Sequence, residues 1–193
     1  MKTNLYNLYL FRAIEAYPYE LEKAAEALNY ALAYDPENVT ALCLMAKLQS
    51  EQLGDYETAK AFYEKAIASN MDMPDIYPDY SRLLVNNGDY DEAQKLIYFA
   101  LTIKGIDKAA IQLNQGYLFE ALNEFEKAEE ALEDSKMFAL NNDFVYFIDE
   151  VIKRVSKKRK TQNNKNRVKE TQEPAKAETS KTNWFQTRLN NLL

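Results

Sequence analysis

The stretch that decides the fold is residues 53–67, LGDYETAKAFYEKAI, in which a Gly-Asp turn leads into an amphipathic pattern. Within it, Ala59, Tyr63 and Ala66 follow one another at the spacing of one face of an α-helix. Glycine accepts the left-handed conformation that ends a helix, and aspartate can cap the start of the next one. The stretch therefore predicts the turn and second helix of a helical pair.

The pattern around Ala59 returns three more times along the chain. Small residues recur at intervals of 35, 34 and 35 residues, at Ala24, Ala59, Ala93 and Ala128. A period in the low thirties indicates a stack of identical supersecondary units.

One repeat is longer than the others between its two helices. The small residue of the first helix and that of the second helix are 13 positions apart in repeat two, from Ala46 to Ala59, but 12 apart in repeats three and four. Repeat two therefore holds one extra residue in its first helix or turn.

The same reading extends to the other repeats and to the segment that follows them. We expect helical pairs over residues 5–34, 39–70, 75–103 and 109–140. An amphipathic helix over residues 143–158 would then cap the last pair, because an open stack would expose an apolar end. The register of the first helix stays open, since either Arg12 or Ala13 fills its small-residue position.

Composition excludes several classes of function. The 193 residues contain no histidine and one cysteine, Cys43, so we expect no disulfide, no metal centre and no histidine-based catalysis. No glycine-rich phosphate loop is present, and we predict neither an enzyme nor a cofactor. No stretch is apolar enough to span a membrane and no signal peptide is recognisable, so a cytoplasmic location is expected.

Charge divides the chain into an acidic body and a basic tail. Residues 1–152 carry 12 Lys/Arg against 27 Asp/Glu, whereas residues 153–193 carry 12 against 3. We expect a helical-repeat domain with its capping helix at 1–158, a basic disordered linker at 159–181 and a short amphipathic motif at 182–193.

The repeat is similar to the tetratricopeptide repeat. Residues 53–67 resemble its second half closely, residues 88–93 (GDYDEA) and 31–38 (ALAYDPEN) match other portions, and the resemblance covers about residues 5–140. It implies an all-α fold, a right-handed α-solenoid of about four helix pairs plus the C-terminal capping helix. In that family the first helix of each pair lines a concave groove that holds an extended or helical peptide of a partner.

The family geometry, carried onto this chain, gives a set of candidate groove residues. They are Tyr6, Tyr9, Leu44, Lys47, Asp79, Arg82, Asn114 and Tyr117. The alternative for each is that it merely packs helix against helix or is solvated. One subclass of the family binds the C-terminal carboxylate of its partner through basic residues in the first helices. Repeat three has Asp75 and Asp79 at the corresponding positions, so binding of a terminal carboxylate is disfavoured.

The end of the chain is the second candidate interaction site. If residues 182–193 are helical, their large apolar side chains lie on one face, beside the only tryptophan: Trp184, Phe185, Leu189 and Leu192. Such a segment fits a tethered docking motif for a second partner. The alternatives are a segment that folds back onto the protein's own groove and a frayed tail.

These observations favour a non-enzymatic adaptor or chaperone-like scaffold that binds a protein or peptide partner. One alternative is a nucleic-acid-associated protein that uses the basic residues from Lys153 to Lys169. Another is a structural subunit of a larger assembly. The sequence does not decide the oligomeric state or the identity of the partner.

Overall fold

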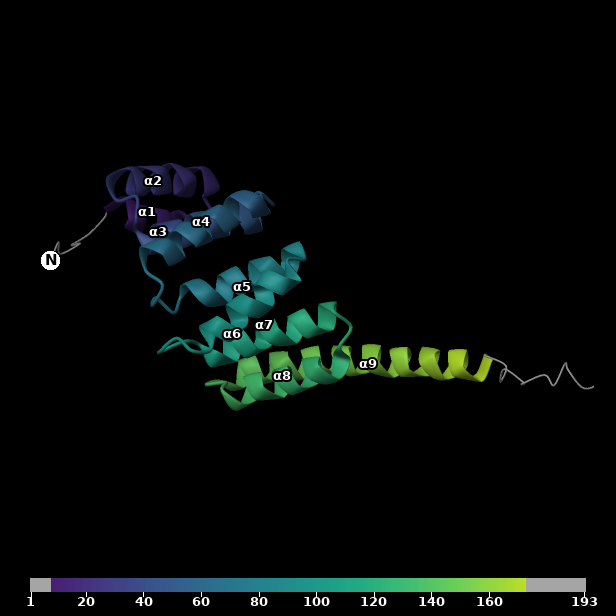
Figure 1. The fold of residues 1–193 in the computed structure, drawn as a ribbon. Helices are drawn as coiled ribbons and strands as arrows, with labels where there is room; N and C mark the ends of the chain where they lie inside the picture. Colours follow the sequence, from purple (N-terminus) through teal and green to yellow (C-terminus); the bar gives the residue numbers. More distant parts are fainter. Residues whose placement is uncertain (1–7, 173–193) are drawn as a thin grey trace, which may run out of the picture. The chain divides into compact units, whose positions relative to one another are not determined.

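The structure is a computed structural model that describes residues 8–172, with side chains described up to Arg167. The chain divides into two units, residues 1–155 and 156–193. Within the described residues every regular element is helical, as the sequence predicted (Figure 1). The elements are α1 (Leu8–Ala16), α2 (Leu21–Tyr34), α3 (Val39–Lys47), η1 (Leu48–Gln52), α4 (Tyr56–Ser69), α5 (Ile76–Asn87), α6 (Tyr90–Ala100), α7 (Lys108–Ala121), α8 (Phe125–Met137) and α9 (Asn142–Gln172).

The first unit is a stack of helix pairs, α1 with α2, α3 with α4, α5 with α6 and α7 with α8, each packed against the next (Figure 1). The four repeated alanines lie where the helices touch, and all have 0% exposed area: Ala24, Ala59, Ala93 and Ala128. Gly116 occupies the small-residue position of α7. A Cβ there would lie 2.7 Å from Cγ of Leu132 in α8, so this pair of helices approaches too closely for a larger residue.

The turns between paired helices use the residues that a left-handed conformation favours. Gly54 and Gly88 have φ angles of 68° and 88°, and Asn123, which replaces glycine in repeat four, has a φ of 61°. Asp55 caps α4 by accepting a hydrogen bond from the Thr58 amide at 3.0 Å. The equivalent Asp89 makes no side-chain cap. Instead, its carboxylate accepts from the Asn87 amide and lies 3.6 Å from Lys60 Nζ.

The extra residue of repeat two takes the form of a π-helix. Between α3 and α4 the chain forms η1, in place of the regular α-helical turn that ends α5 and α7. A π-helical turn accommodates one more residue than an α-helical turn and is frequent at functional sites. The first helix also has a fixed register, because Ala13 is fully buried and Arg12 is exposed.

The end of α9 differs from the prediction. The sequence placed the helix end at Lys158 and a disordered linker from residue 159, but residues 159–172 are helical. The physical reason is composition: Lys, Arg, Gln and Glu are good helix formers, and neither glycine nor proline interrupts the chain before Pro174. The first part of α9 packs its predicted apolar face, with Ile148, Val151 and Val155 buried against α7 and α8.

Candidate functional site

The first helices of repeats one to three, together with η1, α4 and the loop before α5, line a groove with two hollows. We call them the first hollow, of about 190 Å³, and the second hollow, of about 260 Å³. The first is lined by Ile14, Thr40, Cys43, Leu44, Lys47, Met73, Asp75 and Asp79. The second is lined by Ser50, Glu51, Tyr56, Tyr63, Asp79, Arg82, Leu83 and Asn86. Asp79 contributes to both, so the two hollows adjoin.

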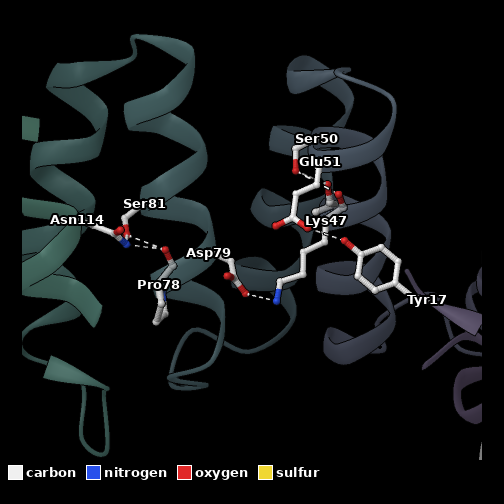
Figure 2. Close-up of polar contacts among 9 residues, drawn as sticks. Tyr17, Lys47, Ser50, Glu51, Pro78, Asp79, Ser81 and Asn114 are labelled. Atoms are coloured by element: carbon white, nitrogen blue, oxygen red, sulfur yellow. Dashed lines mark hydrogen bonds and ion pairs between the residues drawn. The ribbon is translucent and has the colours of Figure 1, made fainter. Parts of the chain in front are cut away.

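An ion pair lies where the two hollows meet. Lys47 Nζ in α3 is 2.7 Å from Asp79 Oδ2 in α5, with the two side chains 33% and 36% exposed (Figure 2). A pair this open to water contributes little to stability, because solvent screens it. A bound segment can therefore exchange its own polar groups with either partner at small cost.

Further polar contacts join neighbouring first helices along the same row (Figure 2). The Tyr17 hydroxyl donates to Glu51 Oε2 at 2.5 Å, linking the turn that follows α1 to η1. Asn114 Nδ2 in α7 donates to the Pro78 carbonyl oxygen at 2.7 Å and to Ser81 Oγ at 2.8 Å. These contacts link the turn after α1 to η1, and α5 to α7.

Burial and charge set the chemistry of the titratable groups in the groove. Burial raises the pKa of the Cys43 thiol to about 12, and the negative charge of Asp79 adds to the effect. Burial also raises the pKa of Tyr17 to about 12, with a further contribution from its hydrogen bond to Glu51. Cys43 is thus a protonated, weakly nucleophilic thiol at neutral pH, as expected for a packing residue.

Four of the predicted groove residues lie together around the hollows: Leu44, Lys47, Asp79 and Arg82. The prediction for Asn114 was wrong as regards exposure. Its side chain is only 2% exposed, because it is held between α5 and α7 by the two hydrogen bonds described above. It is a packing residue between α5 and α7, not one that a ligand reaches.

The other predicted residues are dispersed. Tyr9 lies away from the two hollows, stacked on Tyr30 of α2 with ring centroids 5.0 Å apart. Tyr117 lies under the guanidinium of Arg154, which is 5.8 Å from its ring centroid. Tyr6 and the motif residues Trp184, Phe185, Leu189 and Leu192 lie outside the described residues.

Sequence reasoning missed Ile14, which contributes to the first hollow and is 48% exposed. The signal was present but ambiguous. Lys47 and Arg82 directly follow the small residues Ala46 and Ser81, and Ile14 directly follows Ala13 in the same way. With Ala13 in the small-residue position of the first helix, the same rule predicts Ile14 as a groove residue. Glu51 was missed because its place depends on the π-helical form of η1.

An ion pair also fixes the C-terminal end of the first unit. Arg154 of α9 donates to both carboxylate oxygens of Glu120 in α7, at 3.1 and 2.6 Å. The Glu120 side chain is only 8% exposed, so its carboxylate has lost most of its hydration. The two hydrogen bonds from Arg154 compensate for that loss. The pair therefore fastens the capping helix to repeat four.

Two features of the described part of the chain bear on other functions. Residues 8–172 contain no group of three or more Cys, Asp or Glu side chains arranged to hold a metal ion. None of the helices in this range is both long and apolar enough to cross a membrane.

Comparison with known proteins agrees with the helical-pair geometry. A family profile described as the tetratricopeptide repeat matches residues 51–97, which include the second helix of repeat two and both helices of repeat three. Residues 51–97 therefore carry tetratricopeptide-repeat sequence. No curated protein sequence matches it.

Solved structures extend the tetratricopeptide likeness to most of the chain. Pseudomonas aeruginosa pilF has 19% identity and a TM-score of 0.64, over 80% of this chain and 74% of that one. The MamA protein has 18% identity and a TM-score of 0.58, over 87% and 95%. The O-GlcNAc transferase of Thermobaculum terrenum has 20% identity and a TM-score of 0.57, but this chain spans only 25% of that one. The likeness confirms the predicted solenoid fold, and the repeats support a protein-interaction scaffold.

Proposed function

We propose that the protein is a non-enzymatic, cytoplasmic adaptor with a chaperone-like role, which binds a segment of a partner protein in the groove. The observation that carries the proposal is the pair of adjoining hollows between the first helices of repeats one to three. The first hollow offers Ile14, Leu44 and Met73 for apolar anchors of the bound segment. Buried apolar anchors surrounded by polar groups are the usual source of affinity in such recognition.

Polar groups in the second hollow would orient the bound segment. The carboxylates of Glu51 and Asp79 are already engaged by Tyr17 and Lys47, whereas no ion pair involves Arg82 within the described residues. A guanidinium with its donors available fits a carboxylate or a backbone carbonyl of the partner. We therefore expect the bound segment to contain apolar anchors. These are followed by acidic side chains, or by backbone carbonyls that are free to accept from Arg82.

Site-specific photo-crosslinking tests the groove directly. A photoreactive amino acid replaces Leu44 in the full chain, and the matched control places it at Lys95, an exposed residue of the second helix α6. Cell extract is irradiated, and the adducts are identified by mass spectrometry. We expect adducts at position 44 that are absent at position 95 and that Arg82→Ala reduces. Equal adduct yields at both positions would contradict groove binding.

We further propose that residues 182–193 form a tethered motif that binds a second partner. The support is the sequence pattern of Trp184, Phe185, Leu189 and Leu192, since these residues lie outside the described structure. Trp184 is the only tryptophan, so its emission reports on this segment alone. A blue shift when a captured partner is added, lost with Leu189→Ala and Leu192→Ala together, would support the motif. Unchanged emission with every captured partner would refute it.

A second candidate function is binding to nucleic acid through the basic part of α9. Residues 151–169 contain nine Lys or Arg and no Asp or Glu, and they lie in one continuous helix. Such a helix fits the phosphate backbone, and its affinity would fall with salt because bound counterions are released. A titration with single-stranded DNA at several salt concentrations decides. Binding that is absent, or that survives replacement of the four residues Lys157 to Lys160 by glutamine, excludes this function.

A further inference from the structure

The repeat-one end of the stack carries a hollow that is separate from the groove. It has a volume of about 370 Å³, and its lining includes Tyr9, Arg12 and Ala16 of α1 and Lys23, Ala27 and Tyr30 of α2. Within the described part of the chain, the lining comes from these two helices and from Glu20, which precedes α2. This end of the stack is visible at α1 and α2 in Figure 1.

Repeat symmetry identifies this face as a packing surface. Ala27 follows Ala24 by three residues, as Phe62 follows Ala59 and Leu96 follows Ala93. Phe62 is partly buried and packs against the core of the preceding repeat, which contains Ala24, Leu28 and Ala31. In repeat one the same position holds a small alanine, and the space that a neighbouring repeat would fill is the hollow.

Exposed aromatic side chains frame the hollow. Tyr30 is 51% exposed and Tyr9 is 38% exposed. Tyr30 stacks on Tyr9, and the guanidinium carbon of Arg12 lies 5.7 Å from the Tyr9 ring centroid. Tyrosine and arginine are enriched in protein interfaces, because they combine large contact areas with directional polar groups.

Charge favours a second copy of the same chain as the occupant. The hollow is lined by two basic residues, Arg12 and Lys23, and by three acidic ones, Glu15, Glu20 and Glu26. Lys23 pairs with Glu20 of its own chain, so Arg12 is the basic group that a two-fold axis through this face can place beside Glu15 or Glu26 of the other copy. The repeat domain as a whole is strongly acidic, with 12 Lys/Arg against 27 Asp/Glu in residues 1–152, whereas the hollow has an excess of one acidic residue, so two copies repel each other least at this face.

The other end of the first unit limits how copies can associate. There, α9 covers repeat four with Ile148, Val151 and Val155. Head-to-tail stacking of one copy on the next is therefore blocked, whereas among residues 8–172 no other element lines the α1–α2 hollow. We propose that the protein forms a two-fold symmetric dimer through the α1–α2 face around Tyr9 and Tyr30.

Light scattering coupled to size-exclusion chromatography tests this dimer with the full chain, over a range of protein concentrations. We expect a mass of twice the chain mass of 22.4 kDa at high concentration, with no larger species. Tyr30→Glu places a charge in the interface and should raise the dissociation constant at least tenfold. The matched control is Tyr98→Glu in α6, because Tyr98 is also a second-helix tyrosine with 51% of its area exposed. It should leave the dimer unchanged.

Three results would overturn the proposal. They are a monomer at every concentration, a mass that rises past two chains, and a dimer that Tyr30→Glu and Tyr98→Glu affect equally. Circular dichroism shows whether each variant keeps its helices. The dimer does not depend on groove binding, so adducts formed at position 44 are expected to persist in Tyr30→Glu.

Discussion

At the scale of single residues, the contacts of Gly116 explain why the small positions of the repeat matter. Alanine would be favoured over glycine inside a helix by about 1 kcal/mol. A Cβ at this site, however, would lie 2.7 Å from Leu132 Cγ, and overpacking costs about 1–3 kcal/mol. We therefore expect Gly116→Ala to lower the free energy of unfolding, measured by urea denaturation.

A second substitution distinguishes this clash from a general defect. Leu132→Ala destabilises the protein by itself but removes the two nearest atoms that a Cβ at position 116 would meet, and leaves the Ala128 carbonyl oxygen at 3.4 Å. In that background Gly116→Ala should be neutral, or stabilising by up to about 1 kcal/mol. An equal cost of Gly116→Ala in both backgrounds would show that close approach of α7 and α8 is not the cause.

The single cysteine offers a pH-dependent readout of the groove. Because the pKa of Cys43 is raised to about 12 by burial and by Asp79, the thiolate is scarce at pH 8. An unperturbed thiol has a pKa of about 8.5, so alkylation of the folded protein should be about a thousandfold slower than that of the unfolded chain. The rate should rise about tenfold per pH unit up to pH 11.

Two variants of the neighbouring ion pair assign the cause of this shift. The charge of Asp79 raises the pKa of Cys43 and the charge of Lys47 lowers it. Asp79→Asn should therefore speed alkylation by iodoacetamide at pH 8, and Lys47→Met should slow it. A midpoint of the pH–rate profile near 8.5 would mean that Cys43 is not buried in solution.

At the scale of elements, η1 shows what an insertion does to the groove. Deleting Gln52, an exposed residue of η1, restores the 12-residue spacing of repeats three and four. We expect the variant to fold with an α-helical turn in place of η1, because the π-helix is not required by the repeat. In that variant Glu51 should no longer accept the hydrogen bond from the Tyr17 hydroxyl. Tyr17→Phe should therefore lower the free energy of unfolding of the parent chain but not that of the deletion variant.

The matched control for this deletion removes Lys65 from the regular helix α4. That change rotates the rest of the helix and takes Ala66 out of the core, so it should destabilise the protein strongly. If both deletions are equally damaging, η1 is needed for folding and is not an accommodated insertion.

The same elements show how far the sequence could predict this structure. Periodicity identified the repeats and even the insertion, because small residues must recur wherever helices touch. It could not identify the π-helical form of η1, since one extra residue can also lengthen a turn. It could not tell that Asn114 is buried, because burial depends on Pro78 and Ser81 of a neighbouring repeat. The polar composition after Lys158 predicted a disordered linker, but no glycine or proline ends the helix before Pro174, and residues 159–172 are helical.

At the scale of the whole molecule, the ends of the stack differ in how they are closed. Ile148, Val151 and Val155 of α9 cover Leu113 and Leu132 of repeat four. Burying each such side chain contributes about 1.5–3 kcal/mol. The three together approach the free energy of unfolding of a typical domain, about 5–15 kcal/mol.

Two truncations test this role of α9. A chain ending at Val155 keeps all three side chains and the Arg154–Glu120 ion pair, so its thermal midpoint should stay close to that of the full chain. A chain ending at Asn141 loses them and exposes the apolar surface of α7 and α8. Because each repeat depends mainly on its neighbours, the loss should begin locally. Hydrogen exchange followed by mass spectrometry should show α7 and α8 deprotected while α2 and α3 remain protected. Uniform deprotection of every helix would mean that the stack unfolds as one unit, and equal protection in both truncations would mean that α9 does not cap the stack.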